Sequence, residues 1–249
     1  MRIGLIADIH ANAPALAAVL AALRREGVDE IVCLGDVVGY NAEPDASVDL
    51  LRATTDRVVF GNHDFAVLHG DRLDGTNSAA RTAIAWTRAC LSPAARAWLA
   101  ALPARLVSPG RYVAVHGCFL HDDHYHGYVT GAAVRANLDA VAARPDWPTI
   151  AFCGHTHLPM CGWLEGQIVH SNPLLRAVRW PAEARAVLIN PGSVGQPRDR
   201  DPRAAAAVVD LERREVTPIR CDYDLARTTA AIRSAGLPGA LAERLRLGV

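Results

Sequence analysis

The sequence contains no lysine, and its cationic side chains are 26 arginines. Aspartate and glutamate also number 26, so the formal net charge is zero. Without an excess of cations, sequence-independent binding to nucleic acid or another polyanion is not expected, because such binding needs many cationic side chains that neutralise phosphates. Intrinsic disorder is excluded as well, since 51% of the residues are hydrophobic and only 21% are charged.

Long apolar runs and paired cysteine motifs are also missing. In the first half of the chain the longest charge-free apolar run covers residues 14–23, well short of the roughly 18–20 residues that cross a bilayer. The apolar start of the chain resembles a signal peptide only as far as Asp8. None of the six cysteines belongs to a Cys-x-x-Cys pair, so we expect reduced thiols and no zinc knuckle. These features favour a cytoplasmic protein of enzyme size.

The hydrophobic pattern predicts an α/β fold in one domain that spans residues 1–249. Apolar runs at 3–7, 31–34, 58–60, 112–115 and 150–153 predict buried strands. The first helix is predicted to begin at an Asn12 N-cap and to end at Gly27. Further helices are predicted over residues 45–52, 76–90, 92–102 and 130–142. This βαβ alternation predicts a largely parallel sheet.

From residue 160 onward the pattern changes to hairpins. The Glu165-Gly166 pair suits a tight turn between two short strands, and residues 206–211 and 216–219 form another strand pair. We therefore expect a second, hairpin-rich sheet. A last helix is predicted from Leu225, with an interruption at residues 236–238.

Polar side chains follow five of the predicted strands at the point where each strand ends. They are Asp8 and His10, then Asp36, then Asn62, His63 and Asp64, then His116, and finally His155 and His157. The loops at the carboxyl ends of parallel strands line one crevice in an open α/β sheet. We therefore expect these carboxylates, amide and imidazoles to lie close together.

The order of these residues resembles the calcineurin-like metallophosphoesterase superfamily. The matching motifs are Asp8-x-His10, Gly35-Asp36, Gly61-Asn62-His63-Asp64, His116-Gly117 and Gly154-His155-Thr156-His157. Residues 190–199 resemble the closing loop of its small bacterial phosphodiesterase branch. The resemblance implies a four-layer fold, in which two facing mixed β-sheets are sandwiched between helices, and two divalent metal ions in the crevice.

Carried onto this sequence, the resemblance implies seven metal ligands. One metal would be held by Asp8, His10, Asp36 and His157, and the other by Asp36, Asn62, His116 and His155, with the Asp36 carboxylate bridging. Oxygen and imidazole donors without thiolate suit Mn, Fe, Co, Ni or Zn, of which we expect manganese to support activity. Two metals about 3.5–4 Å apart can share a bridging hydroxide and clamp the entering and leaving oxygens of an in-line displacement.

His63 is the predicted catalytic residue, because it lies next to a ligand and can protonate the leaving oxygen or stabilise charge on the phosphoryl group. In some relatives an acid three residues after the bridging aspartate orients this histidine. The sequence has Gly39 at that position, so the orienting group is left open, with Asp64 as a neighbour. Ala11 replaces the usual glycine of the Asp-x-His-Gly-Asn string.

Weaker signals surround these motifs. Asn12 is a candidate for substrate binding, with its N-cap role as an equal alternative, and Arg198 is a second candidate. The alternating charges of residues 199–203 favour an internally paired loop. The polar run 121–126 is expected to overhang the crevice, where it holds a third metal, recognises substrate or is a solvated loop.

The predicted function is hydrolysis of a phosphodiester or nucleotide-like phosphoester bond by in-line attack of a metal-bridging hydroxide. Alternatives on the same site are a protein or small-molecule phosphomonoesterase and a dinucleoside polyphosphate hydrolase. An HD-type phosphohydrolase is disfavoured, because His63-Asp64 follows a strand and a glycine. A non-catalytic scaffold is the alternative of another class. The expected partner is a small phosphoester, no membrane partner is expected, and homo-oligomerisation is left open.

Overall fold

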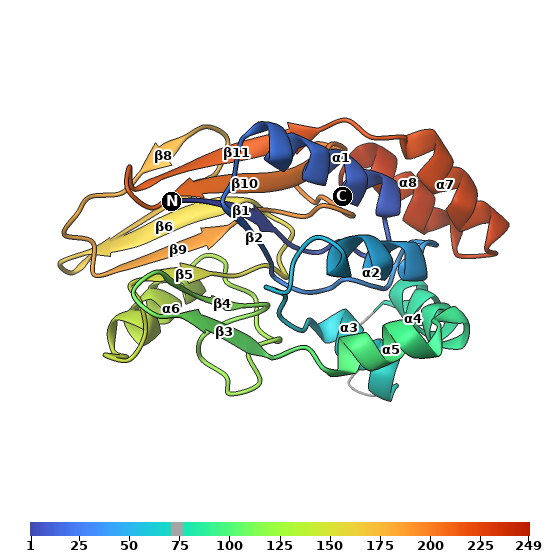
Figure 1. Cartoon of the computed structure of the whole chain (residues 1–249), viewed down its shortest axis with the longest axis horizontal. Coiled ribbons are helices and arrows are strands. Elements are labelled where there is room, and N and C mark those ends of the chain that lie inside the picture. Colours follow the sequence, from blue (N-terminus) through green and yellow to red (C-terminus); the bar gives the residue numbers. More distant parts are fainter. Residues whose placement is uncertain (71–76) are drawn as a thin grey trace.

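The strands of the computed structural model form two mixed β-sheets that lie face to face (Figure 1). The structure describes residues 1–70 and 77–249. Its strands are β1 (Arg2–Ile6), β2 (Glu30–Cys33), β3 (Arg105–Ser108), β4 (Tyr112–Val115), β5 (Ile150–Phe152), β6 (Met160–Glu165), β7 (Ile168–Pro173), β8 (Val178–Arg179), β9 (Ala186–Asn190), β10 (Ala204–Asp210) and β11 (Glu215–Cys221). Within the described residues one sheet has the order β2-β1-β10-β11-β8 and the other β3-β4-β5-β9-β6-β7.

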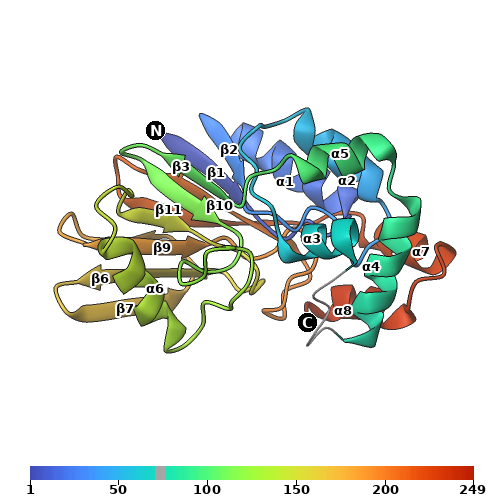
Figure 2. The ribbon, with the colours of Figure 1, turned by 90° about the horizontal axis from the view of Figure 1, so that it is seen from below.

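The helices cover the outer faces of the sheets and gather at one end of the molecule. They are α1 (Ala13–Arg25), α2 (Pro44–Arg52), α3 (Asn62–His69), α4 (Ser78–Cys90), α5 (Pro93–Ala100), α6 (Ala133–Ala142), α7 (Leu225–Ser234) and α8 (Gly239–Leu247). α1 packs on β10 and β11, and α6 packs on β6 and β9. The other helices lie beyond the sheet ends (Figures 1 and 2). The expected four-layer arrangement of two facing mixed sheets between helices is confirmed.

Apolar side chains fill the space between the two sheets. Leu5 and Val209 of one sheet share a buried cluster with Tyr112 and Phe152 of the other. The Tyr112 and Phe152 rings stack with their centroids 5.0 Å apart. Each such side chain contributes about 1.5–3 kcal/mol on burial, so this layer holds the sheets together and fixes where their strands end.

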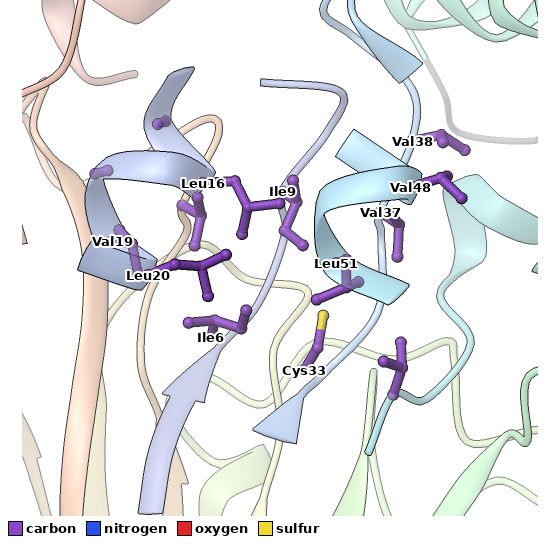
Figure 3. Close-up of a cluster of buried hydrophobic side chains, with 14 of the residues drawn as sticks. Ile6, Ile9, Leu16, Val19, Leu20, Cys33, Val37, Val38, Val48 and Leu51 are labelled. Atoms are coloured by element: carbon purple, nitrogen blue, oxygen red, sulfur yellow. The ribbon is translucent and has the colours of Figure 1, made fainter. Parts of the chain in front are cut away.

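A second apolar cluster lies beneath α1 and α2 (Figure 3). Leu16 and Leu20 of α1 lie toward Ile6 of β1, while Leu51 of α2 lies close to Cys33 of β2 (Figure 3). All five side chains are at most 1% exposed. The cluster therefore anchors the last residues of β1 and β2, from which the first two polar loops emerge.

The first helix is formed as its sequence predicts. The Asn12 side chain accepts a hydrogen bond from the Ala15 N–H at 3.3 Å, and Pro14 occupies the first turn. Leu16, Leu20 and their neighbours at helical spacing are buried. The chain leaves the helix through Gly27, which has a φ of 62°. This position favours glycine because other residues are strained in the left-handed region.

The predicted division into one parallel sheet and one hairpin sheet is wrong. β1 pairs with β2 in parallel but also with β10 in antiparallel orientation, and β9 joins β5 in parallel to the antiparallel β6. Each sheet therefore takes strands from both halves of the chain. Hydrophobic patterning shows that a strand is buried, but the neighbour is chosen by packing of the two sheets against each other.

Several element boundaries also differ from the predictions. Residues 58–60 form no strand, because only Val58 bridges to Cys33 before Phe60 turns to bond with Pro103. β3 was not predicted, since it is a short edge strand with a mostly exposed or half-exposed pattern. The helix predicted from residue 130 begins at Ala133, and the one predicted to reach 102 ends at Ala100. The predicted helix start at residue 76 lies outside the described residues.

Two further features bear on the class of protein. No helix in the described ranges is long and apolar enough to cross a membrane. All six cysteines are free, and Cys90 is the exposed one among them.

Candidate metal centre

The polar loops that follow the strands are hydrogen-bonded to one another at one end of the sheets. The Asp8 N–H donates to the Gly35 carbonyl oxygen at 3.0 Å, and the Gly154 N–H donates to the His116 carbonyl oxygen at 2.8 Å. These bonds pair loops within each sheet. The His155 N–H donates to the Asp8 carboxylate at 3.1 Å and thereby connects the two sheets. The expected convergence therefore occurs, but across two sheets and not along one.

The donor atoms of six predicted ligands fall into two groups. Within each group the ligand atoms lie within 4.8 Å of one another, and every member is buried. The first group is Asp8, His10, Asp36 and His157, and the second is Asp36, His116 and His155. Asp36 belongs to both groups, so its carboxylate lies between two positions that suit cations.

The first group contains two imidazole nitrogens that face each other. His10 Nε2 lies 3.1 Å from His157 Nε2. The other ring nitrogens face main-chain carbonyl oxygens, His10 Nδ1 that of Val38 at 3.2 Å and His157 Nδ1 that of Gln196 at 2.6 Å. Each Nδ1 therefore faces a hydrogen-bond acceptor, which leaves the two Nε2 atoms as the ones placed to bind a cation. Two facing imidazole nitrogens beside carboxylates fit a bound cation.

The second group has the same construction. His116 Nδ1 faces the Leu34 carbonyl oxygen at 2.6 Å, so its Nε2 points inward, 3.4 Å from Asp36 Oδ2. Asn62 Oδ1 lies 3.0 Å from the same Nε2 and adds an amide oxygen to the group. All seven predicted ligands therefore lie around these two positions. Their roles as ligands stay a prediction.

Burial and charge set the protonation states of these side chains. Burial lowers the pKa of His10 and of His155 well below the usual imidazole range, which keeps both rings neutral. Burial raises the pKa of Asp36, but the nearby His116 and His63 outweigh it and hold that pKa well below its usual range. For His116, burial lowers the pKa and the Asp36 carboxylate raises it, with a net pKa of about 9. A metal at this position therefore displaces a proton.

The ligand-bearing loops are strained. Five of the seven predicted ligands are non-glycine residues with φ between 50° and 66°: Asp8, His10, Asp36, His155 and His157. Each such residue costs of order 1–3 kcal/mol, and strain of this kind persists where surrounding structure enforces it. Gly61 removes a clash here, because a Cβ at that position would meet Asp36 Oδ1. The backbone is thus bent to direct these side chains inward.

The loop after β9 supports the centre from behind. The Ser193 hydroxyl donates to the Asp8 carbonyl oxygen at 2.8 Å and accepts from the Gln196 N–H at 2.8 Å. The Gln196 carbonyl oxygen in turn orients His157. Asn190 donates to the Gly154 carbonyl oxygen at 2.7 Å. The loop therefore holds the main chain at Asp8 and Gly154 and the ring of His157, without itself supplying a ligand.

The sequence pattern of the calcineurin-like phosphoesterase superfamily domain matches residues 1–214. The chain belongs to this superfamily.

Several relatives match the phosphoesterase over nearly its whole length. An uncharacterised protein of Methanocaldococcus jannaschii is 34% identical over 99% of this chain and 98% of its own. The crystal structure of a metallophosphoesterase from Sphaerobacter thermophilus is 36% identical, with a TM-score of 0.84 over 100% of this chain and 99% of that one. A hypothetical protein from Pyrococcus horikoshii OT3 has the same fold, with a TM-score of 0.79 at 21% identity over 100% and 98% of the two chains.

These similarities confirm the resemblance stated from the motifs and the assignment to the metallophosphoesterases, a class of hydrolases. Together with the buried Asp and His groups, they imply that the phosphoesterase binds divalent metal.

His63 of the phosphoesterase lies beside the ligands without belonging to either group. Its N–H donates to Asp36 Oδ1 at 2.8 Å, which fixes the start of α3 against the bridging carboxylate. Its Nδ1 is buried and has no hydrogen-bond partner. Burial lowers the pKa of His63 to about 4. The ring is held by packing, since its centroid lies 4.5 Å from that of Tyr40 and 4.8 Å from that of His10.

The backbone at Gly39 explains why no acidic residue stands there to orient His63. This glycine has a φ of 90°, and a Cβ there would lie 2.6 Å from His63 Nδ1. An acidic side chain therefore has no room in this arrangement. Asp64 does not replace it, because its carboxylate accepts hydrogen bonds from the N–H groups of Val37, Val38 and Gly61. Asp64 instead clamps two of the polar loops together.

The two candidates for substrate binding in the phosphoesterase differ in their surroundings. Asn12 is fully buried, caps α1, and donates to the Gly195 carbonyl oxygen at 3.2 Å. The N-cap role of Asn12 is therefore observed, while its contact with substrate stays a prediction. Arg198 is half-buried, and its Nη2 lies 3.5 Å from the Tyr40 hydroxyl.

The polar run 121–126 is folded back on its own loop. The Gly117 N–H donates to the His124 carbonyl oxygen at 2.7 Å, and the Cys118 N–H donates to that of His126 at 3.1 Å. The His126 ring contacts Asp123 at 3.0 Å. Among the described residues, no third group of metal-ligand type includes this run. Its predicted third metal site is therefore not supported.

Three residues near the centre were missed or undervalued by sequence reasoning. Tyr40 contacts the rings of both His10 and His63. Tyr128 stacks on His155, with ring centroids 4.2 Å apart. Arg244 of α8 lies near Tyr40, with its guanidinium carbon 5.9 Å from the ring centroid. Tyr40 was marked by its position four residues after Asp36, but no local pattern marks Tyr128 or Arg244.

Proposed function

We propose that this phosphoesterase is a dinuclear metal-dependent phosphodiesterase that hydrolyses a small, soluble phosphodiester. The observation that carries the proposal is the pair of overlapping donor groups that share the Asp36 carboxylate. A shared carboxylate suits two cations held close together, and such pairs are used to displace a leaving oxygen from phosphorus.

The donor atoms fit divalent transition metals. One position offers oxygens of Asp8 and Asp36 with nitrogens of His10 and His157, and the second offers Asp36 with Asn62, His116 and His155. Mixed oxygen and imidazole donors suit Mn, Fe, Co, Ni or Zn, and we propose Mn for activity. When bound, these ions supply Lewis-acid stabilisation of the phosphoryl oxygens and a lowered pKa for the attacking water.

His63 is proposed to act on the leaving oxygen. Its N–H contact with Asp36 and its packing against Tyr40 hold the ring beside the donor groups. Its Nδ1 is buried against Gly39, so we propose that Nε2 is the nitrogen that passes a proton to the leaving oxygen. Burial excludes bulk water from it, which strengthens any interaction with a developing negative charge.

A small substrate is favoured over a large polyanion. The net charge of the chain is zero, so no general attraction to nucleic acid is available. Six of the seven predicted ligands are at most 8% exposed. The reacting phosphate therefore has to enter between the loops that carry them. A short ester with one accessible phosphodiester meets this requirement.

The test is turnover of bis(p-nitrophenyl) phosphate by the metal-depleted protein after addition of manganese. We expect activity that depends on the added metal, and higher activity on the diester than on p-nitrophenyl phosphate. A preference for the monoester would make the protein a phosphomonoesterase on the same site. No turnover of any phosphoester with any of the five metals would favour a non-catalytic scaffold.

A further inference from the structure

Two half-buried arginines lie beside the candidate metal centre without an aspartate or glutamate partner in the described part of the chain. Within the described residues, neither Arg198 nor Arg244 forms an ion pair with an aspartate or glutamate side chain. Arg198 Nη2 contacts the Tyr40 hydroxyl at 3.5 Å and Gln196 Oε1 at 3.2 Å, and its Nε is buried without a hydrogen-bond partner. Arg244 Nε donates to the Val249 main-chain oxygen at 2.7 Å.

The acidic residues next to Arg198 in sequence are used elsewhere. Asp199 pairs with Arg220 of β11, and Asp201 pairs with Arg203 at 2.7 Å. The predicted internal pairing of this charged run therefore occurs, but it leaves out Arg198. Its positive charge stays available on the side of the loop that faces Tyr40.

The two arginines are close enough to repel each other. The pKa of Arg244 is lowered, first by burial and next by the charge of Arg198. Both side chains contact Tyr40, Arg198 at its hydroxyl and Arg244 at its ring. Two guanidinium cations held around one tyrosine repel each other, and an anion bound between them relieves that repulsion.

The fold holds this arrangement in place. The Arg200 N–H donates to the Gly248 carbonyl oxygen at 2.8 Å, which clips the end of α8 to the loop that carries Arg198. Tyr40 is buried in a cluster with Leu241, Leu245 and other side chains of α4, α7 and α8. In Figure 2 these helices gather at the same end of the molecule as α3. We call Tyr40, Arg198 and Arg244 the arginine rim.

We propose that Arg198 and Arg244 bind a second phosphate group of the substrate, so that the substrate is a small phosphodiester that carries a further phosphate. This inference rests on the proposed phosphodiesterase function and names its substrate class. Guanidinium groups bind phosphate oxygens through paired N–H donors. The Tyr40 ring contacts His10 and His63, while its hydroxyl contacts Arg198. One tyrosine therefore separates the two phosphates, a span that a sugar with phosphates on two carbons can bridge.

Arg244 lies in the C-terminal part of the chain. The superfamily pattern matches residues 1–214, whereas α8 spans Gly239–Leu247. The second cation is thus supplied from outside the residues that the superfamily pattern covers. A charge placed beside the metal centre affects substrate choice and leaves the ligands of the centre as they are.

The experiment compares two diesters that differ by one phosphate. Manganese-loaded protein is given thymidine 5′-(p-nitrophenyl phosphate) and its 3′-phosphorylated form, and kcat/KM is measured for each. We expect the 3′-phosphorylated diester to be preferred by about 10-fold or more, the scale of charge-assisted hydrogen bonds. Arg244→Gln and Arg198→Gln should each remove most of this preference. Arg246→Gln, an exposed arginine of the same helix, is the matched control and should retain it.

A binding measurement separates the subsite from turnover. Calorimetric titration with thymidine 3′,5′-bisphosphate and with thymidine 5′-monophosphate should show tighter binding of the bisphosphate, and Arg244→Gln should abolish the difference. If neither diester is hydrolysed, the proposed function fails, while this titration still decides on the subsite. Equal kcat/KM for both diesters together with equal binding of the two nucleotides would overturn the inference and leave the phosphodiesterase function standing. Should Arg244→Gln fail to fold, Arg198→Gln decides alone.

Discussion

The seven predicted ligands, here called the metal cradle, and the arginine rim are adjacent but built in different ways. The cradle consists of short loops whose bends place five of the seven ligands at positive φ, and main-chain carbonyl oxygens orient three of its imidazoles. The rim consists of three side chains from separate parts of the chain, held by the packing of α4, α7 and α8. The cradle is therefore fixed by the backbone and the rim by tertiary contacts.

This difference indicates that the cradle carries the chemistry and the rim sets substrate selectivity. Backbone hydrogen bonds and strained φ values fix ligand positions closely, as a metal centre requires. Side chains held by helix packing can be exchanged without disturbing those loops. We therefore expect changes in the cradle to abolish reaction on every substrate, and changes in the rim to alter which substrate is preferred.

The largest effect is expected from Asp36→Asn, which removes the carboxylate common to both donor groups. The amide has no charge to hold a cation pair, so metal content measured by elemental analysis should fall at both positions. Turnover should drop by about 10⁴-fold or more, since several kcal/mol of metal-derived stabilisation is lost.

The matched control is Asp146→Asn, an exposed aspartate that belongs to neither donor group. It should leave metal content and turnover at the wild-type level. Full metal content in Asp36→Asn would show that the cradle does not depend on a shared carboxylate.

His63→Ala should lower turnover at the metal centre without loss of metal. His63 belongs to neither donor group, so metal content should be unchanged while kcat falls by about 10²- to 10³-fold, as for loss of a general acid. His69→Ala, an exposed histidine at the end of the same helix, is the control. Wild-type kcat in His63→Ala would remove this residue from the mechanism.

Gly39→Ala tests the contact between the loop after Asp36 and the catalytic ring. The new methyl group would lie 2.6 Å from His63 Nδ1, so the ring has to move. We expect kcat to fall by roughly 10- to 100-fold with metal content retained, because a displacement of about 1 Å can cost that much. Gly110→Ala is the control, since its φ of 70° is equally strained but nothing lies near its Cβ. Equal kcat in the two variants would contradict the positional role of Gly39.

Leu241→Ala tests whether the packing around the arginine rim can be weakened without loss of metal from the cradle. Leu241 is 1% exposed in the cluster that encloses Tyr40, so its truncation should destabilise the protein by about 2–5 kcal/mol in chemical denaturation. Metal content should stay at the wild-type level, and KM should change only a few-fold. Leu247→Ala, which is 62% exposed on the same helix, should be close to neutral. Loss of metal from Leu241→Ala would show that rim and cradle are not independent.

Sequence reasoning located the residues of the centre because each lies in a short motif at a strand end. Asp8 with His10 and His155 with His157 occur within three residues of each other, and adjacent glycines such as Gly61 mark the turns. It failed on sheet membership, because the pairing of β1 with β10 depends on a partner some 200 residues away. Sequence reasoning left two roles open for Asn12, whose contacts with Gly195 and Thr228 join segments far apart in the chain.

The order of residues along the chain is enough to predict which side chains gather at the centre, the first helix with its cap, and the family. These depend on residues that are neighbours along the chain, where spacing and turn chemistry act directly. Three features follow from the tertiary structure alone. The polar loops come from two sheets, a side chain at position 39 would clash with His63, and the two arginines of the rim meet at Tyr40. Such contacts follow from the packing of segments that are distant in the chain. Because any partner of suitable shape can bury an apolar surface, the local sequence does not specify which segment that partner is.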